Sequence, residues 1–169
     1  MSESRVVPFL SQYDDSVPER WQKEGCGIVA LIIVLRTLSG EKTLSIENLF
    51  DEGEFIGGFG PRGWTHDALV ILAHNHGVHA YKQEFRSNDE TIANRLAEEG
   101  ALKIKKTLAE GLPVLVSIEK PNGSYHIVVL IEMSKGGFVY HDPEAGQSQI
   151  ISFDEFLKKW RRLSVFFEE

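Results

Sequence analysis

Apolar positions are spaced like helices in the first half of the chain and like strands in the second half. The longest apolar run covers residues 28–35, and it predicts a helix from Gly27 to Leu38. Further helices are predicted at 45–50, at 66–76, after 87–90, at 102–109 and at 153–160. Strands are predicted at 78–85, 113–118, 125–131, 138–142, 149–152 and 164–167. Because the helices come mainly before the strands, the pattern indicates an α+β fold with an antiparallel sheet.

Capping residues mark several of these helix starts. Thr65 directly precedes the helix predicted at 66–76. Ser87-Asn-Asp-Glu90 and Ser152-Phe-Asp-Glu155 both have the spacing of a capping box, in which the serine and the acid each bond a backbone N–H. The first box therefore predicts one helix, and a second short helix is predicted from Leu102 to Ala109.

The runs at 125–131 and 138–142 are joined by a short turn that contains Gly136 and Gly137, which is typical of a β-hairpin. A turn centred near Ser134 or Lys135 puts His126 opposite Asp142 or its neighbour. Opposed side chains in such a hairpin lie about 5 Å apart at Cβ and point to the same face. We therefore expect the Asp142 carboxylate to hold the His126 imidazole.

Cys26 is the only cysteine, and it lies between two glycines at the start of the predicted 27–38 helix. Unpaired backbone N–H groups and the helix dipole favour a thiolate at this position. Gly25 and Gly27 have no Cβ, which leaves room for a substrate backbone to approach the sulfur. A buried core cysteine is the alternative interpretation.

A thiol at a helix start, a strand histidine and a carboxylate on the next strand are the parts of a Cys-His-Asp triad. In such a triad the imidazole takes the thiol proton, and the aspartate fixes the tautomer and orientation of the ring. Spacing along the chain does not decide whether Cys26 meets His126, because that contact depends on tertiary structure.

A set of short segments spread over most of the chain carries a resemblance to a known family. The segments are Val7-Pro-Phe-Leu-Ser-Gln-Tyr-Asp14, Trp21, Gly25-Cys-Gly27, Tyr125-His-Ile-Val-Val129 and His141-Asp-Pro-Glu144. Together they resemble the papain-like bacteriocin-leader peptidases, family thirty-nine of the cysteine peptidases, and their standalone relatives. Known members of this family cut after double-glycine leaders.

The resemblance implies a papain-like α+β fold, in which an N-terminal helical part carries the cysteine and a C-terminal antiparallel sheet carries the histidine and aspartate. It implies that Cys26 is the nucleophile, His126 the base and Asp142 the orienting acid. It also makes Gln12 the side-chain donor of an oxyanion hole, where each donor is worth roughly 3 kcal/mol. Cleavage after small residues such as Gly-Gly is expected by analogy with the family.

Three residues depart from the family's usual pattern. Ile28 and Val29 follow the Cys-Gly pair, where the family commonly has proline and a small hydroxyl residue. Tyr125 precedes the histidine, where glycine or histidine is often found. We expect these positions to touch the lining of the cleft, and therefore to change substrate specificity more than chemistry.

Composition narrows the class of protein. A chain of 169 residues with 42% hydrophobic content is suited to one peptidase domain, 1–169. A net charge of −7 argues against a nucleic-acid partner, and one cysteine forms no internal disulfide. The N-terminus has no apolar signal region, and no apolar run reaches the roughly 20 residues that span a bilayer. A cytoplasmic protein without membrane insertion is expected, whereas the oligomeric state is not indicated.

The glycine-rich segment Gly57–Gly63 is interpreted as a flexible connector, with a mobile wall of the substrate cleft, carrying Phe59 and Trp64, as the alternative. It lacks the Gly-Lys-Ser/Thr ending of a phosphate-binding loop, so no nucleotide site is predicted. The basic run Lys158–Arg162 is interpreted as a solvated face.

Other histidines raise the question of a metal site or a different base. His66, Asp67, His74, His76 and His79 are near one another in the sequence, but the histidine side chains diverge on a helix and Gly77 ends that element. No metal or other cofactor is therefore predicted. His141 adjoins Asp142 but alternates to the opposite strand face, which makes it a weak rival to His126 as base.

These features predict a cysteine peptidase that hydrolyses a peptide or protein substrate through an acyl-enzyme on Cys26. An acyltransferase or transpeptidase, or an isopeptidase, would use the same triad. A noncatalytic peptide-binding module on the same fold is the alternative outside enzymology, although it would have no need to keep Cys26, His126 and Asp142 together.

Overall fold

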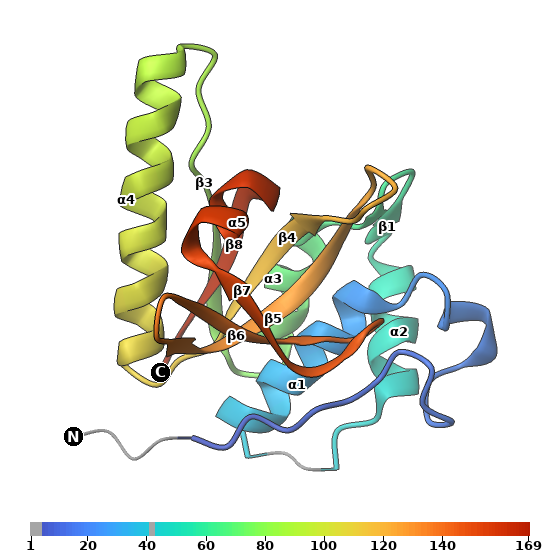
Figure 1. The fold of residues 1–169 in the computed structure, drawn as a ribbon. Coiled ribbons are helices and arrows are strands. Elements are labelled where there is room, and N and C mark those ends of the chain that lie inside the picture. The colour runs from blue at the N-terminus through green and yellow to red at the C-terminus, as the bar shows by residue number, and fades with distance from the viewer. Residues whose placement is uncertain (1–4, 41–42) are drawn as a thin grey trace.

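The protein, seen in a computed structural model that describes residues 5–40 and 43–169, is built around an antiparallel sheet (Figure 1). The helices are η1 (Glu19–Trp21, a 3-10 helix), α1 (Cys26–Leu38), α2 (Ile46–Phe55), α3 (His66–Asn75), α4 (Glu90–Ala109) and α5 (Phe153–Lys159). The strands are β1 (Phe59–Gly60), β2 (Gly63–Trp64), β3 (His79–Glu84), β4 (Val114–Glu119), β5 (Tyr125–Ser134), β6 (Gly137–Asp142), β7 (Gly146–Ser152) and β8 (Trp160–Glu168). Six strands form the main sheet in the order β3-β8-β4-β5-β6-β7, and β1 and β2 form a separate hairpin.

Both faces of the main sheet are covered, and the strand sequences show why. Along β5, Ile127 and Val129 belong to a hydrophobic cluster with α1, α2 and α3, whereas Val128 and Leu130 belong to a second cluster with α4 and α5. Successive strand residues point to opposite faces, so a strand buried on both sides needs an unbroken apolar run. Figure 1 shows the consequence, with α1 and α4 on opposite sides of the sheet.

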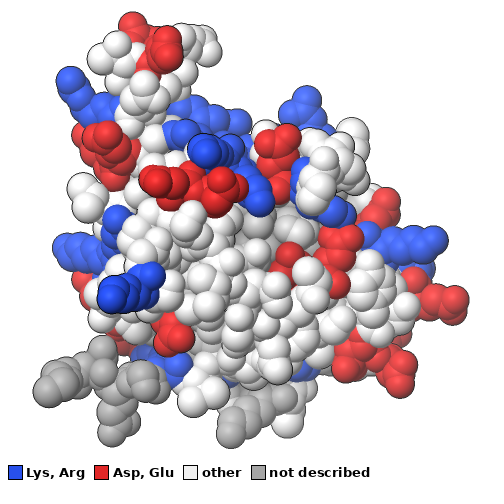
Figure 2. All heavy atoms as spheres, in the orientation of Figure 1, with Lys and Arg blue, Asp and Glu red and all other residues white. Residues whose placement is uncertain are grey.

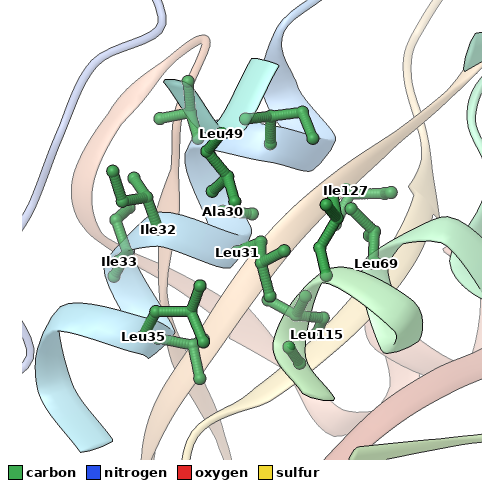
Figure 3. Close-up of a cluster of buried hydrophobic side chains, with 14 of the residues drawn as sticks. Ala30, Leu31, Ile32, Ile33, Leu35, Leu49, Leu69, Leu115 and Ile127 are labelled. Atoms are coloured by element: carbon green, nitrogen blue, oxygen red, sulfur yellow. The ribbon is translucent and has the colours of Figure 1, made fainter. Parts of the chain in front are cut away.

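Helix α1 is the centre of the first cluster. Every residue from Ile28 to Leu35 is at most 1% exposed, because neighbouring elements surround this helix. A helix that is apolar on all sides is stable only when it is buried on all sides. Figure 3 shows its side chains packed between Leu49 of α2, Leu69 of α3 and the strand residues Leu115 and Ile127. The sheet and two helices thus fix the position of the α1 start, where the cysteine lies.

Helix α4 corrects the prediction of two helices in this region. It runs unbroken from Glu90 to Ala109, and its N-cap is Asp89, whose side chain accepts a hydrogen bond from Ile92 N, rather than Ser87. Gly100 lies within it, where an added Cβ would come 2.6 Å from Trp160 and 2.7 Å from Phe85. The glycine therefore permits close packing on the sheet. The caps predicted at Thr65 and Ser152 are confirmed by hydrogen bonds to Ala68 N and Glu155 N.

The segment Gly57–Gly63, interpreted from sequence as a flexible connector, is instead part of the β1–β2 hairpin. Its Phe59 packs against Trp21 and Trp64, with ring centroids 5.1 and 5.3 Å away. The ring centroid of Trp64 also lies 4.9 Å from that of Trp21 and 5.8 Å from that of Phe50. This aromatic cluster packs the hairpin against the helical part of the molecule.

None of the helices within 5–40 and 43–169 has the length and apolar character needed to cross a membrane. The expected order of elements is otherwise observed, with α1, α2 and α3 mainly before the strands. Helices α4 and α5 differ from that simple order, because they lie later in the chain and cover the second face of the sheet.

Candidate active site

Cys26 is the first residue of α1, as the sequence predicted, and Gly25 is its N-cap. The glycines on either side are required by packing. A Cβ on Gly25 would come 2.7 Å from Trp21 O, and a Cβ on Gly27 would come 2.8 Å from Trp64 Cβ. The expectation that these glycines admit a substrate backbone is not met, because the atoms close to both of them belong to the protein itself.

The pKa of the Cys26 thiol is raised in this structure, mainly because burial disfavours the charged thiolate. The backbone N–H groups of Ile127 and Gly27 act in the opposite direction, while the carboxylates of Asp142 and Glu144 add to the increase. The expectation that the helix start alone would favour a thiolate is therefore wrong for this arrangement, because desolvation outweighs the N–H groups. A reactive thiolate here needs a base or a cation beside it.

His126 lies near the start of β5, and its ring touches two carboxylates. Its Nε2 is 3.3 Å from Asp142 Oδ2, and its Nδ1 is 3.2 Å from Glu144 Oε2. Strands β5 and β6 pair Val129 with His141, so the same register continued past β6 puts His126 opposite Glu144 rather than Asp142. The expected contact with Asp142 is present, but it is a diagonal contact two residues out of register.

Asp142 is buried and is held by the turn that follows it. Its Oδ1 accepts hydrogen bonds from Glu144 N at 2.9 Å and Ala145 N at 3.1 Å. This leaves Oδ2 for the His126 ring. Because three contacts fix one small side chain at the end of β6, Asp142 presents its carboxylate in a single direction.

Glu144, which the sequence motifs contained without indicating a role for it, is part of the site. Its carboxylate bonds Lys120 Nζ at 2.8 Å as well as His126. The hydrogen bond from Lys120 lowers the Glu144 pKa, and burial acts in the opposite direction. The same bond raises the pKa of Lys120. Glu144 lies in the turn between β6 and β7, so strand alternation gave no signal for it, and its nearness to Asp142 in the sequence was the sign that could have revealed it.

Gln12 is buried at 2% exposure beside the cleft that contains Cys26. Its backbone N–H donates to Pro143 O, and its Nε2 donates to Gln22 O, both at 2.8 Å. A carboxamide carries two N–H donors, so one remains after the bond to Gln22. The structure thus ties the N-terminal segment to the turn that holds Asp142.

Cys26, Gln12 and His126 line one open cleft with a volume of about 490 Å³, together with Glu144 and Lys120. Phe59 and Trp64 form part of its wall, as the alternative interpretation of the Gly57–Gly63 segment expected. Of the three departures from the family pattern, Tyr125 lines this cleft. Ile28 and Val29 are completely buried in the core, so the expectation that they touch the cleft is wrong.

His141 lies on β6 but serves another purpose. Its Nε2 bonds Val7 O at 2.9 Å, and its Nδ1 accepts from Ser148 N at 3.1 Å. Its ring also contacts that of Phe9, with centroids 5.5 Å apart. Both ring nitrogens are therefore occupied in fastening the N-terminal segment to the sheet.

The histidines at the α3 end have protein partners. His74 bonds Ala80 O, His76 contacts Glu52, and His79 contacts Glu168. Within the residues that the structure describes, no three His, Cys, Asp or Glu side chains are grouped so as to hold a metal ion.

The sequence of this chain fits the pattern of a known peptidase family. The sequence model of the peptidase C39-like family matches residues 5–165. The chain belongs to the peptidase C39-like family. This membership makes it a cysteine peptidase, and it confirms the resemblance seen in the motifs. A comparison with curated proteins gave no match.

Solved structures share the fold at low sequence identity. A double-glycine-motif protease from an AMS/PCAT transporter, solved with the leader peptide, is 18% identical, with a TM-score of 0.65 over 99% of this chain and 95% of that one. The peptidase domain of Streptococcus ComA is 16% identical, with a TM-score of 0.68 over 96% and 98%. A putative C39-like peptidase from Bacillus anthracis is 18% identical, with a TM-score of 0.67 over 99% and 98%. The predicted papain-like α+β fold is thereby confirmed.

Proposed function

We propose that this cysteine peptidase cleaves peptide bonds through a triad of Cys26, His126 and Asp142, with Gln12 as an oxyanion donor. The observation that carries the proposal is the single cleft lined by Cys26, His126 and Gln12, in which Asp142 contacts the His126 ring. Cys26 attacks the carbonyl carbon, His126 takes the thiol proton and gives it to the leaving amine, and water releases the acyl-enzyme.

Of the two carboxylates on His126, we assign the orienting role to Asp142. Asp142 is anchored by two backbone N–H groups, and its side chain is 6% exposed. The Glu144 side chain is 30% exposed and also bonds Lys120. Moving away from the His126 ring therefore costs Glu144 less free energy than it would cost Asp142. Its departure frees Nδ1 to accept the thiol proton, and proton transfer can then overcome the raised thiol pKa.

The substrate we propose is a peptide with small residues before the scissile bond, such as Gly-Gly. The double-glycine-motif protease solved with its leader peptide supports this by likeness of fold. Trp64 and Ile127 line the cleft beside Cys26, so large apolar side chains form the wall next to the thiol.

Alkylation of Cys26 by iodoacetamide, followed from pH 5 to 10, tests the assignment of the triad. An ordinary thiol has a pKa of about 8.5 and reacts slowly below that pH. If His126 takes the Cys26 proton, labelling should persist well below pH 8.5 despite burial, and it should slow in His126→Ala and Asp142→Ala. Glu144→Gln should label faster than the parent, because a negative charge that raises the thiol pKa is removed. His79→Ala is the matched control, since His79 is exposed and contacts Glu168 far from the cleft lining.

Labelling that follows an ordinary thiol and ignores both His126→Ala and Asp142→Ala would identify a structural cysteine and favour a noncatalytic peptide-binding module. Hydrolysis and acyl transfer are distinguished by adding an amine to the cleavage reaction. A new amide product would show that the acyl-enzyme reacts with the amine in preference to water, as in a transpeptidase.

A further inference from the structure

A second groove lies next to the cleft, and arginines dominate it. It has a volume of about 640 Å³ and is lined by Arg62, Arg86, Arg161 and Arg162, together with Ser124, Tyr125 and Trp160. None of these lining residues is acidic, although the chain as a whole has a net charge of −7. On the face shown in Figure 2, basic and acidic side chains are mixed around an uncharged centre. This arginine groove is therefore a local concentration of positive charge on an acidic protein.

The groove corrects the interpretation of Lys158–Arg162 as a solvated face. Helix α5 ends at Lys159, and the chain passes directly into β8, where Trp160 is buried at 3% exposure. Arg161 and Arg162 then lie on β8 and line the groove. The sequence run is continuous, but the change from helix to strand divides it between solvent and this concave surface.

Two of the four arginines have no carboxylate partner within residues 5–40 and 43–169, namely Arg62 and Arg161. Arg86 pairs with Glu84 at 3.0 Å, and Arg162 donates to Leu157 O at 3.0 Å. The Arg161 guanidinium lies 5.3 Å from the centre of the Tyr125 ring, an attractive cation–π contact. Two guanidinium groups thus line a concave surface without an ion pair among the described residues, which leaves their N–H donors available to a carboxylate or another anion.

The arginine groove is continuous with the catalytic cleft. Arg62, Ser124, Tyr125 and Arg161 line both. A peptide that reaches Cys26 and extends past Tyr125 would therefore come to lie along the arginines.

A third cavity, of about 340 Å³, adjoins the same arginines and supports a polar ligand. Arg62, Arg86 and Arg161 line it together with His66, and its two acidic residues, Asp67 and Glu84, are already paired with Lys82 and Arg86. His66 is 7% exposed, and its Nε2 has no hydrogen-bond partner in the described chain. Burial and the nearby Arg161 and Lys82 lower the pKa of His66 to about 4, so the ring is neutral near pH 7. An unpartnered imidazole beside free guanidinium groups leaves unmet hydrogen-bonding capacity in this part of the molecule.

We propose that the arginine groove binds an acidic segment of the peptide substrate, so that Asp or Glu residues near the scissile bond increase affinity. This inference rests on the proposed function, because it assumes that the substrate is a peptide held in the adjoining cleft. The carboxylates would form charge-assisted hydrogen bonds with Arg62 and Arg161, which place the peptide as well as attract it.

Binding is measured on Cys26→Ala, so that no hydrolysis interferes, with fluorescein-labelled decapeptides that carry a central Gly-Gly. One peptide has four glutamates on one side of Gly-Gly, its matched control has four glutamines there, and a second pair carries them on the other side. Fluorescence anisotropy is expected to show that one glutamate peptide binds about tenfold more tightly than its glutamine control, with a preference that weakens as salt rises.

In the Cys26→Ala background, Arg62→Gln with Arg161→Gln should remove this preference. Arg95→Gln with Lys135→Gln is the matched control, because it makes the same change in net charge at two exposed residues outside the groove and should keep the preference. Thermal unfolding of both double variants shows whether each is folded. Arg62→Gln alone, at an exposed turn residue, repeats the test with the smallest change to the structure.

Equal binding of glutamate and glutamine peptides, or a preference that survives in the Arg62/Arg161 double variant, would overturn the proposal. Equally tight, groove-dependent binding of a single-stranded decanucleotide would overturn it too, by revealing a general anion site. The two proposals fail separately. Cleavage without any preference for acidic peptides rejects only the groove, whereas groove-dependent binding without cleavage by the parent rejects only the proposed function.

Discussion

The two walls of the cleft are held in place by different forces. On the helix wall, Cys26 begins a helix whose next residues are completely buried and make apolar contacts. On the strand wall, His126 is held by Asp142 and Glu144, and Glu144 is held in turn by Lys120. Packing therefore determines where the thiol lies, whereas hydrogen bonds and ion pairs determine where the imidazole points.

This difference separates stability from chemistry. Apolar contacts are numerous and give a large share of the free energy of folding, and they allow little movement. Polar contacts at a partly exposed site add little to stability but are directional. We therefore expect changes in the helix wall to affect folding first, and changes in the strand wall to affect catalysis first.

The largest effect is expected from His126→Ala in the strand wall. Loss of the general base and acid should lower kcat/KM by roughly 10²- to 10⁴-fold, with the melting temperature almost unchanged. The measurement uses the best substrate found in a set of fluorogenic peptides with Gly-Gly. His74→Ala, a change of the same residue type at the far end of α3, should retain the parent rate. Unfolding of His126→Ala would break the proposed division between the two walls.

The helix wall is tested by Leu31→Ala, because Leu31 is fully buried in α1. Removing a large side chain from such a core should cost about 2–5 kcal/mol in the free energy of unfolding, measured by urea titration. Leu102→Ala, at a residue 64% exposed, is the control and should cost far less. The folded fraction of Leu31→Ala should keep its rate of cleavage, and a large loss of rate per folded molecule would contradict the comparison.

Gln12 combines features of both walls, because it is buried like the residues of the helix wall but hydrogen-bonded like those of the strand wall. If its second amide N–H stabilises the oxyanion, Gln12→Ala should lower kcat about 10²- to 10³-fold and leave KM nearly constant. The control is Gln147→Ala, an exposed position on β7. A change in KM alone would instead assign Gln12 to substrate binding.

The smallest effect is expected from the stabilising contacts of Glu144. Its pKa is lowered in the folded state, chiefly by Lys120, so it stabilises the fold above its ordinary pKa, and this contribution disappears as pH falls through the lowered value. Glu144→Gln should therefore cost less than about 1 kcal/mol at pH 7, and nothing in strong acid, where the carboxyl is protonated in both states. Urea titrations of parent and variant at a series of pH values from 7 downward measure how this difference falls. A difference in the free energy of unfolding that grows as pH falls would contradict this prediction.

Several elements were predicted because the signal was local. The apolar run after Cys26 predicted α1, the serine and threonine caps predicted the starts of α3 and α5, and the glycine turn predicted the β5–β6 hairpin. Local signals were misleading where a distant partner decided the structure. Gly100 lies within a helix that packs closely on Phe85 and Trp160, and Gly57–Gly63 forms part of a hairpin that Phe59 joins to an aromatic cluster.

For the site, the motifs identified Cys26, His126, Asp142 and Gln12 as candidates, and the fold brings all four to one cleft or its edge. The contact of Glu144 with His126 was missed, because it depends on the turn that follows β6. The thiol pKa was also misjudged, since burial by neighbouring elements is invisible in a local sequence.

Residue types at short spacing were enough to identify the family, the helix that starts at Cys26 and the hairpin that carries the histidine. The tertiary structure alone places Asp142 and Glu144 against His126 and leaves Cys26 partly exposed in the cleft. It also decided that Arg62 and Arg161, far apart in the chain, line one groove. The physical reason is that burial, strand register and charge pairing are set by contacts between distant segments, which no local pattern records.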